Sequence, residues 1–272
     1  MNTKNLTVYK SNKLIEASYN LDISEQRIIL ACLSQCNPLE LTEKTAVHLS
    51  ISTITDLADT SSKSVYEELK RATERLFNRQ VVIDNPDPDD PSLTRTRTRW
   101  VSAINYYDGE GRISLHFSSR IIPYLSQLQG QFTKYKLQHV TQFKSSYGVR
   151  LYELLIQWQS KGSREIEINW LRESWGLKNK YKALKDLKKW VIEPAMKDIN
   201  NHSNLWVKFG QRKAGRRVVA FQFQFGLKKP EQDPKKLTKK QAEALARTGE
   251  SYEELHKRLK SEGYKLDIEK FG

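Results

Sequence analysis

The side chains best suited to chemistry in this sequence are cations gathered in one short stretch. Six lysines and one acidic residue, Asp186, lie between residues 178 and 189. Ammonium groups attract anions at long range and donate hydrogen bonds to them at contact, so a dense row of lysines favours a polyanionic partner. The alternative is a plain solvated helix face without a partner.

The spacing of apolar residues in the same stretch predicts an amphipathic helix from about 180 to 200. The predicted buried stripe consists of Leu184, Leu187, Val191, Ala195 and Ile199. In a helix-turn-helix, the first residues of the second helix reach base edges in the DNA major groove. The candidates for base reading are then Asn179, Lys182, Lys185 and Lys189, and those for phosphate contacts are Lys178 and Lys180.

A second cationic cluster lies in a predicted turn between two strands. Apolar residues alternate along 205–209 and again along 221–225, which is typical of a hairpin with one apolar face. The turn at 211–217 carries Arg212, Lys213, Arg216 and Arg217. As the wing of a DNA-binding domain, this tip would touch the DNA backbone or an adjacent minor groove. The alternative is a solvent-exposed turn.

The whole chain is basic, and the excess is concentrated in the region that holds both clusters. Its 272 residues include 46 Lys and Arg against 32 Asp and Glu, a formal net charge of +14. Residues 131–227 carry 19 basic and 7 acidic side chains, net +12, whereas residues 1–130 are net −1 and residues 228–272 net +3. The middle segment has the size of one small DNA-binding domain, so we expect nucleic acid to dock there first.

The elements around this helix-turn-helix repeat an order of elements that occurs earlier in the chain. The first copy is predicted as a helix over 24–36 with Ser24 as N-cap, a strand near 47–51, helices near 52–59 and 63–77, and a hairpin of 81–83 with 95–107. The second copy is predicted as a helix over 143–159, a strand over 165–168, a helix over 169–175 ended by Gly176, and then the long helix and the hairpin described above. This plan predicts an α+β fold with two tandem winged-helix domains, residues 1–130 and 131–227, and a short charged, partly helical tail, residues 228–272.

The cations of the first copy are mixed with acids. Its long helix combines four basic residues with three glutamates over 63–75, and Lys63 at its start is a further candidate DNA contact. Arg95, Arg97 and Arg99 alternate with threonines and therefore share one face of a strand. Either contact with phosphates or neutralisation of the acidic loop at 87–90 would explain this arginine face.

The residue types that most enzymes need do not occur in the required spacing. Cys32 and Cys36 fall inside an apolar helical pattern, where we expect them to pack as small hydrophobic residues. The five histidines are scattered without a His-x-His pair, and no G-x-x-x-x-G-K-[ST] loop occurs. We therefore expect no metal, no cofactor and no catalytic residue, which argues against a nicking initiator or a helicase. The mean hydropathy of −0.68 and the lack of a long apolar run predict a cytoplasmic protein.

Three segments resemble signatures of the iteron-binding plasmid replication initiator (Rep) family. They are Val8–Leu30, Phe143–Leu155 and Val191–Asn200, and they occur in the order found in the family. The resemblance covers about residues 6–226. It implies two winged-helix domains in a bacterial protein of theta-type replication, whose monomers bind direct repeats in double-stranded DNA at a plasmid origin.

The resemblance also implies roles for the two domains. The second domain's recognition helix would make the principal base contacts, and the first domain would contribute backbone contacts and the surface of a homodimer that represses the initiator's own gene. The expected protein partners are the host replication initiator and the replicative helicase. This chain has Lys188-Lys-Trp190 where relatives tend to carry arginines, and lysine lacks the bidentate geometry for guanine. A winged-helix transcriptional repressor without an initiation role is the alternative function.

Overall fold

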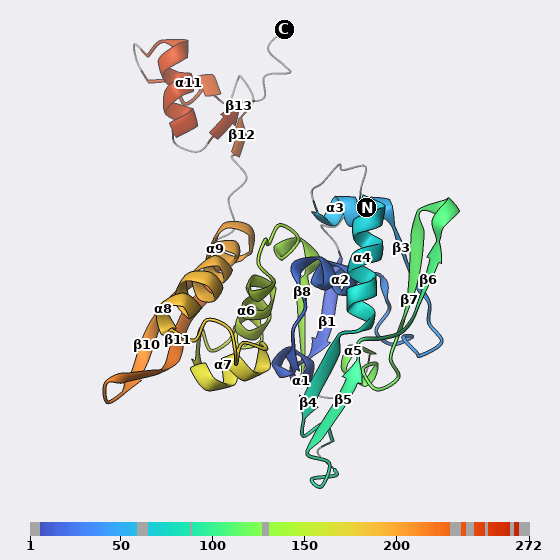
Figure 1. Cartoon of the computed structure of the whole chain (residues 1–272). Coiled ribbons are helices and arrows are strands. Elements are labelled where there is room, and N and C mark those ends of the chain that lie inside the picture. Colours follow the sequence, from blue (N-terminus) through green and yellow to red (C-terminus); the bar gives the residue numbers. More distant parts are fainter. Residues whose placement is uncertain are drawn as a thin grey trace. The chain divides into compact units, whose positions relative to one another are not determined.

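The structure is a computed structural model that describes residues 6–58, 65–87, 89–126, 131–228, 235–237, 242–247, 250–261 and 264–266. The chain forms two compact units, residues 1–227 and residues 228–272. We call them unit 1 and unit 2 and describe each by itself. Figure 1 shows their elements.

The second half of unit 1 is a winged-helix domain. It consists of α6 (Ser146–Ile156), β9 (Ser163–Glu167), α7 (Ile168–Ser174), a helical rod of α8 (Leu184–Leu187), η4 (Lys188–Ile192) and α9 (Glu193–His202), and the hairpin β10 (Leu205–Ala214) and β11 (Arg217–Leu227). The three strands form an antiparallel sheet in the order β9–β11–β10.

The first half of unit 1 repeats this topology. It consists of α2 (Ile23–Gln35), β3 (Val47–Ser50), α3 (Ile51–Ala58), α4 (Val65–Phe77), β6 (Val101–Tyr107), the turn η2 (Asp108–Glu110) and β7 (Arg112–Phe117). Its sheet has the order β3–β7–β6, which matches β9–β11–β10 strand for strand. The predicted α+β fold with two tandem winged-helix domains is therefore confirmed.

Additional elements surround the first winged helix. They are β1 (Thr7–Ser11), α1 (Asn12–Glu16), β2 (Ser18–Tyr19), β4 (Gln80–Asp84), β5 (Arg95–Arg99), α5 (Pro123–Ser126), β8 (Phe132–Lys136) and η3 (Leu137–His139). β4 lies between β2 and β5, and β1 pairs with β8. The predicted domain boundary at residue 130 lies between these two paired strands in the sequence, after β1 and before β8. The boundary itself stays a prediction.

Two predictions about the first copy are wrong. The run 95–107 is not one strand, because it breaks at Trp100 into β5, which pairs with β4, and β6, which pairs with β7. Trp100 is fully buried and packs edge-on against Tyr19, so the chain turns there to place the indole in the core. The N-cap of α2 is Asp22 rather than Ser24, because Asp22 forms a reciprocal capping box with Glu25.

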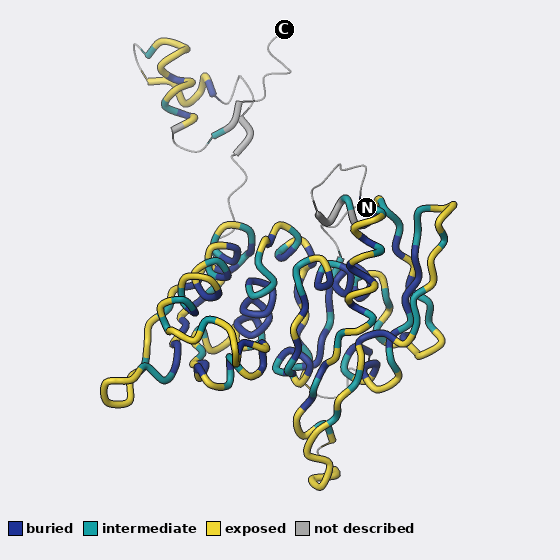
Figure 2. The backbone as a smooth tube through the Cα atoms, viewed as in Figure 1, coloured by how far each residue is buried: buried dark blue, intermediate teal, exposed yellow. Residues whose placement is uncertain are grey.

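Helix α6 lies at the centre of unit 1, and Figure 2 shows it buried along its length. Its Arg150 guanidinium donates to the carbonyl oxygens of Ala17 at 2.7 Å and Tyr19 at 2.6 Å in the first domain. The same group donates to the carbonyl of Ser174 in α7 at 3.0 Å. One buried side chain therefore connects the first domain to the helix-turn-helix of the second.

A buried ion pair lies one turn further along α6. The Lys10 ammonium on β1 is 2.6 Å from Glu153, and the Tyr135 hydroxyl on β8 also donates to this carboxylate. Burial alone would lower the pKa of Lys10, but the attraction of Glu153 outweighs it and the pKa is raised. The pair holds β1 and β8 against α6.

The helical rod is attached to the start of α6. The carboxylate of Asp198 on α9 accepts hydrogen bonds from the backbone N–H groups of Lys144 at 3.0 Å and Ser145 at 2.7 Å. These groups lie just before α6, at its N-cap Ser145 and the preceding residue, where backbone donors lack partners inside the helix. Gly148 permits the close approach, because a Cβ there would lie 2.9 Å from Oδ2 of Asp198 and 3.2 Å from the ring of Phe143.

Unit 2 contains β12 (Lys235–Leu237), α11 (Tyr252–Ser261) and β13 (Tyr264–Leu266), with β12 parallel to β13. The predicted capping box at its helix start is confirmed, because Ser251 N–H donates to Glu254 at 2.9 Å and Glu254 N–H donates back at 3.4 Å. A small apolar cluster consists of Ala242, Leu255 and Leu259. The second predicted capping box, Thr238–Gln241, lies outside the described residues.

We expect Gly148→Ala to lower the free energy of unfolding by about 1–3 kcal/mol, because the added methyl group overpacks the α6–α9 contact. Urea denaturation followed by tryptophan fluorescence measures the change. The matched control is Gly109→Ala, because a Cβ at Gly109 meets nothing within 4 Å. Equal stability of the two variants would contradict the proposed tight approach.

Candidate nucleic-acid interface

The helical rod has the predicted buried stripe. Leu187, Val191, Ala195 and Ile199 are fully buried, and Leu184 is half-buried. Lys185 and Lys189 are exposed on the other side, one turn apart. The rod therefore presents a solvent-facing pair of lysines while its apolar side packs on the domain core.

The rod begins later than the sequence predicts. It starts at Leu184 instead of 180, so Lys178, Asn179, Lys180 and Lys182 lie in the loop that joins α7 to α8. The physical reason is Tyr181, whose φ of +51° is left-handed and cannot continue an α-helix. Gly176 ends the preceding turn as predicted, with φ +67°.

All four loop side chains are exposed. Lys178 forms an ion pair with Glu173 at 2.7 Å, between two groups that are both more than half exposed. Lys180 and Lys182 have no ionic partner among the residues that the structure describes. The loop therefore offers at least two uncompensated ammonium groups next to Lys185 of the rod.

A π-helical turn, η4, interrupts the rod, where the N–H of Glu193 bonds to the carbonyl of Lys188 five residues back. Pro194 explains it, because proline has no N–H to donate to the carbonyl of Trp190 four residues back. Trp190 lies in this turn with 54% of its surface exposed, and the Lys189 ammonium is 4.8 Å from its ring centroid. Trp190 was not among the predicted site residues, although it directly follows Lys188 and Lys189 in the sequence.

The hairpin β10–β11 forms the predicted wing. Its apolar side is buried at Phe221, Phe223 and Phe225, and Gly215 at the tip has φ +61°. Arg212, one of the four predicted tip cations, is 2.8 Å from Glu165 on β9 and is partly neutralised. The others, Lys213, Arg216 and Arg217, are exposed, and within the described part of the chain they have no ionic partner.

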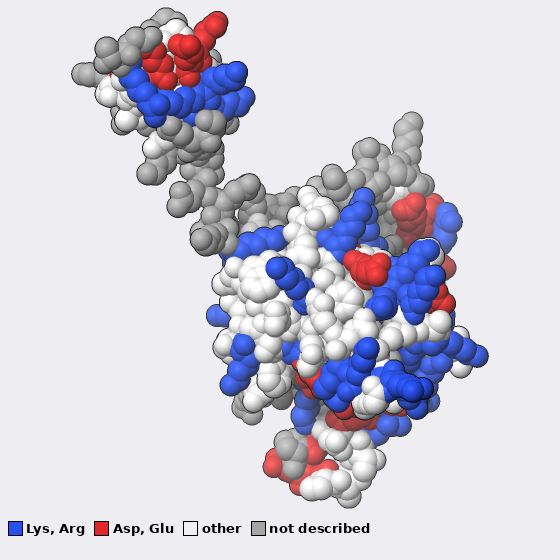
Figure 3. Space-filling model, turned by 90° about the vertical axis from the view of Figure 1, so that its left-hand side faces the viewer, with Lys and Arg blue, Asp and Glu red and all other residues white. Residues whose placement is uncertain are grey.

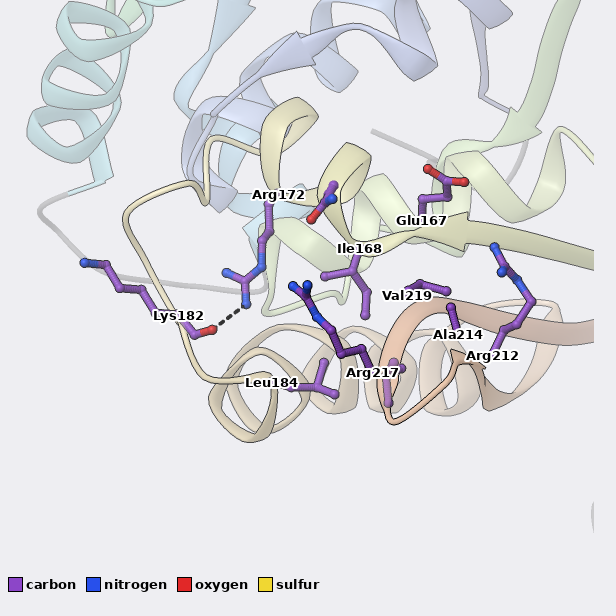
Figure 4. A pocket seen from close by; sticks show the side chains of 11 residues that line it. Glu167, Ile168, Arg172, Lys182, Leu184, Arg212, Ala214, Arg217 and Val219 are labelled. Carbon is purple, nitrogen blue, oxygen red and sulfur yellow. Dashed lines mark hydrogen bonds between the residues drawn. The ribbon is translucent and has the colours of Figure 1, made fainter.

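An open pocket of about 670 Å³ lies between the loop and the wing. Figure 4 shows Arg172 of α7 and Arg217 of β11 directing their guanidinium groups into it from opposite walls. Glu167 is the acidic residue among the side chains that line it. Arg172, Arg212 of β10 and Arg217 thus line a hollow that is open to solvent.

The arginines of β5 share one exposed face, as predicted. Arg95 is 2.8 Å from Asp84 on β4, and this hydrogen bond raises the pKa of Arg95, with a smaller contribution from Glu173 of α7. The acid that Arg95 pairs with therefore lies on the neighbouring strand rather than in the 87–90 loop. Arg99 lies over the ring of Phe77 at 5.3 Å. Arg97 has no ionic partner in the described ranges, and Lys63 lies outside them.

The corresponding helix of the first domain, α4, has two of its described cations engaged with acids, while Arg71 is exposed and has no ionic partner in the described residues. Lys70 is 2.9 Å from Asp108, and Arg75 is 3.0 Å from Asp22. Figure 3 shows the side of unit 1 on which β10, β11 and α7 lie, where Lys and Arg cover more of the surface than Asp and Glu. The two domains share a topology but differ in how far their cations are neutralised.

No group of three or more His, Cys, Asp or Glu in the described residues could hold a metal ion. Burial raises the pKa of Cys32 well above its ordinary value and that of Cys36 to about 11. Among the helices of the described residues, none has the length and apolar character to cross a membrane.

Known proteins share both the sequence pattern and the fold. Residues 7–156 match the family described as "Initiator Replication protein, WH1", and residues 167–225 match "Initiator Rep protein, WH2". An Escherichia coli "Replication initiation protein" is 30% identical over 225 residues, covering 80% of this chain and 69% of that protein. A second E. coli protein, described as an uncharacterized 27.6 kDa protein, is 23% identical over 224 residues, covering 78% of this chain and 92% of that protein.

A solved structure has the same fold. The crystal structure of Pi initiator protein in complex with iteron DNA superposes with a TM-score of 0.69 at 22% identity, covering 84% of this chain and 100% of that chain. The first family match alone spans more than half of the sequence, and the second follows it in the family's order. The chain therefore belongs to the family of replication initiator proteins with two winged-helix domains.

Proposed function

We propose that this initiator binds direct repeats, or iterons, in double-stranded plasmid origin DNA through its second winged-helix domain. The rod would enter the major groove, with Lys185 and Lys189 at base edges. The loop residues Lys178, Asn179, Lys180 and Lys182 would lie beside it at bases and phosphates. The wing residues Arg212, Lys213, Arg216 and Arg217 would hold the backbone or the adjacent minor groove.

The observation that carries this proposal is the difference in charge pairing between two domains of equal topology. On the second domain, most cations of the loop, rod and wing are exposed and lack an acidic neighbour within the described residues. On the first, Lys70 and Arg75 of α4 are paired with acids, and Arg71 is the cation of this helix that has no ionic partner in the described residues. Only unpaired cations leave the positive potential that attracts phosphates and releases counterions.

The first domain would contribute backbone contacts through Arg95, Arg97, Arg99 and Lys63. We propose that monomers bind the repeats and promote origin opening, while homodimers formed mainly through the first domain repress the initiator's own gene. Recruitment of the host replication initiator and the replicative helicase completes this proposal. The protein would act by binding, without a catalytic step or cofactor of its own.

Footprinting on the DNA beside the gene tests this function. We expect protection of tandem direct repeats, with affinity falling steeply with salt and a log–log slope on the order of −6 to −10, since about that many phosphates would be neutralised. A scrambled duplex of the same length and composition is the control. Protection of a lone inverted repeat without direct repeats would favour a repressor instead.

The rod and the wing should differ in what they contribute. We expect Lys185→Ala or Lys189→Ala to weaken binding to the repeat more than binding to a scrambled duplex, because base contacts carry the specificity. Arg216→Ala should weaken both by similar factors, since a phosphate contact is insensitive to sequence. Fluorescence anisotropy with both duplexes gives the comparison. Equal losses for all three variants would show that the rod does not read bases.

A further inference from the structure

The loop between α7 and α8 carries four of the proposed DNA contacts outside regular secondary structure. An exposed loop that becomes ordered only on binding loses backbone entropy at that moment, roughly 1–2 kcal/mol per residue, and binds more weakly for that reason. A loop that is already in its binding conformation avoids this loss. The contacts that fix the loop in the free protein therefore influence affinity without touching DNA.

Arg172 makes such contacts. Its guanidinium donates to three successive carbonyl oxygens of the loop, from Nη1 to Lys180 at 3.0 Å and from Nη2 to Tyr181 at 2.7 Å and Lys182 at 3.1 Å. Figure 4 marks the bond to Lys182 and shows the Lys182 side chain pointing away from the pocket. The bonds use backbone oxygens, so they leave the ammonium groups of Lys180 and Lys182 available.

Three successive carbonyl groups converge on one side chain only where the backbone turns sharply. The turn is made at Tyr181, whose φ of +51° costs a non-glycine residue roughly 1–3 kcal/mol. A strained residue of this kind persists only when its surroundings hold it there. Leu177 is fully buried and Tyr181 packs partly against the core, so apolar contacts fix two points of the loop. Arg172 fixes the backbone carbonyls of Lys180, Tyr181 and Lys182.

We propose that Arg172 is a positioning residue, which holds residues 178–182 in the conformation that binds DNA. It acts through the loop backbone rather than through a DNA contact of its own. Its planar fork of donors suits several acceptors at once, whereas a lysine ammonium concentrates its donors at one point. The inference rests on the proposed function, because it assumes that this loop meets DNA.

Hydrogen–deuterium exchange of the free protein tests the ordering without DNA. In Arg172→Gln, the amides of Leu177 and Lys180, which donate to the carbonyls of Arg172 and Leu177, should exchange at least about 10-fold faster than in the unaltered protein, while the rest of unit 1 stays unchanged. Arg172→Lys should behave like Arg172→Gln, because it keeps the charge but loses the fork. Arg217→Gln is the matched control, since it removes the same charge from the same pocket and has no bond to the loop. Unchanged exchange in Arg172→Gln would overturn the proposal.

A double-mutant cycle with the direct-repeat duplex tests the route of action. Arg172→Gln should weaken binding on the order of 10-fold and lower the salt slope by about two, as Lys180 and Lys182 lose their placement together. In a Lys180→Ala, Lys182→Ala background the same change should cost less than about 2-fold, because the groups that it positions are gone. Arg217→Gln should lower the slope by about one in either background.

The outcomes separate the two proposals. If Arg172→Gln costs the same factor in both backgrounds and lowers the slope by one, Arg172 is an ordinary phosphate contact and the positioning role is wrong. If the unaltered protein binds the repeat no better than a scrambled duplex, the proposed function fails. The exchange measurement would still report whether Arg172 orders the loop, so the two failures are distinguishable.

Discussion

The arrangement of unit 1 depends on the burial of the Arg150 guanidinium at its centre. This cation donates to carbonyls of Ala17 and Tyr19 on one side and of Ser174 on the other, and its charge lies 3.7 Å from the ring centroid of Tyr19. A buried charge is costly unless it is paired or hydrogen-bonded, so a displacement of the first domain that kept the guanidinium buried would leave it without the carbonyls of Ala17 and Tyr19. The contact therefore gives the helix-turn-helix a fixed position on the first domain.

Further contacts reinforce the same boundary. Arg164 on β9 donates to Glu16 of α1 at 2.8 Å, and Gln26 and Arg27 of α2 donate to backbone carbonyls at the start of α6. Burial lowers the pKa of Arg164, although Glu16 opposes the shift. Since α6 touches both domains, the rod that Asp198 attaches to α6 is positioned by the first domain as well as by its own core.

Much of the fold could be predicted from the sequence because it follows from local patterns. The 3.6-residue spacing located α2, α4, α6 and the stripe of the rod, and alternation located β9, β10 and β11, since one-sided burial acts on each element separately. The errors lie where distant contacts decide. Trp100 breaks a strand because its indole is buried against Tyr19, and Tyr181 delays the start of the rod because Arg172 and the core hold its left-handed backbone.

The candidate site was predictable in composition and less so in geometry. The cluster of lysines at 178–189 can be recognised from the sequence alone. Whether each lysine belongs to the helix or to the loop depends on the backbone conformation at Tyr181. Pro194 gave a local signal for the π-helical turn, because a proline beyond the first turn of a helix lacks the N–H that would bond to the carbonyl four residues back. The partial neutralisation of Arg212 could not be foreseen, since Glu165 lies on a separate strand.

Most cations of the loop, rod and wing in the second domain have no acidic partner within the described residues, and Arg172 fixes the loop through neutral acceptors. Arg172 donates to three carbonyl oxygens of the loop. Arg150 also donates to backbone carbonyls, and Arg164 donates both to the carbonyl of Leu154 and to Glu16. An acid-based scaffold would hold the same loop but would cancel the field that draws a polyanion to it. The cost is repulsion among neighbouring lysines, which a fully buried stripe of four apolar residues under the rod can offset at about 25 cal/mol per Å² of apolar surface. The rod thus presents its lysines to solvent on one face and packs its apolar residues on the opposite face.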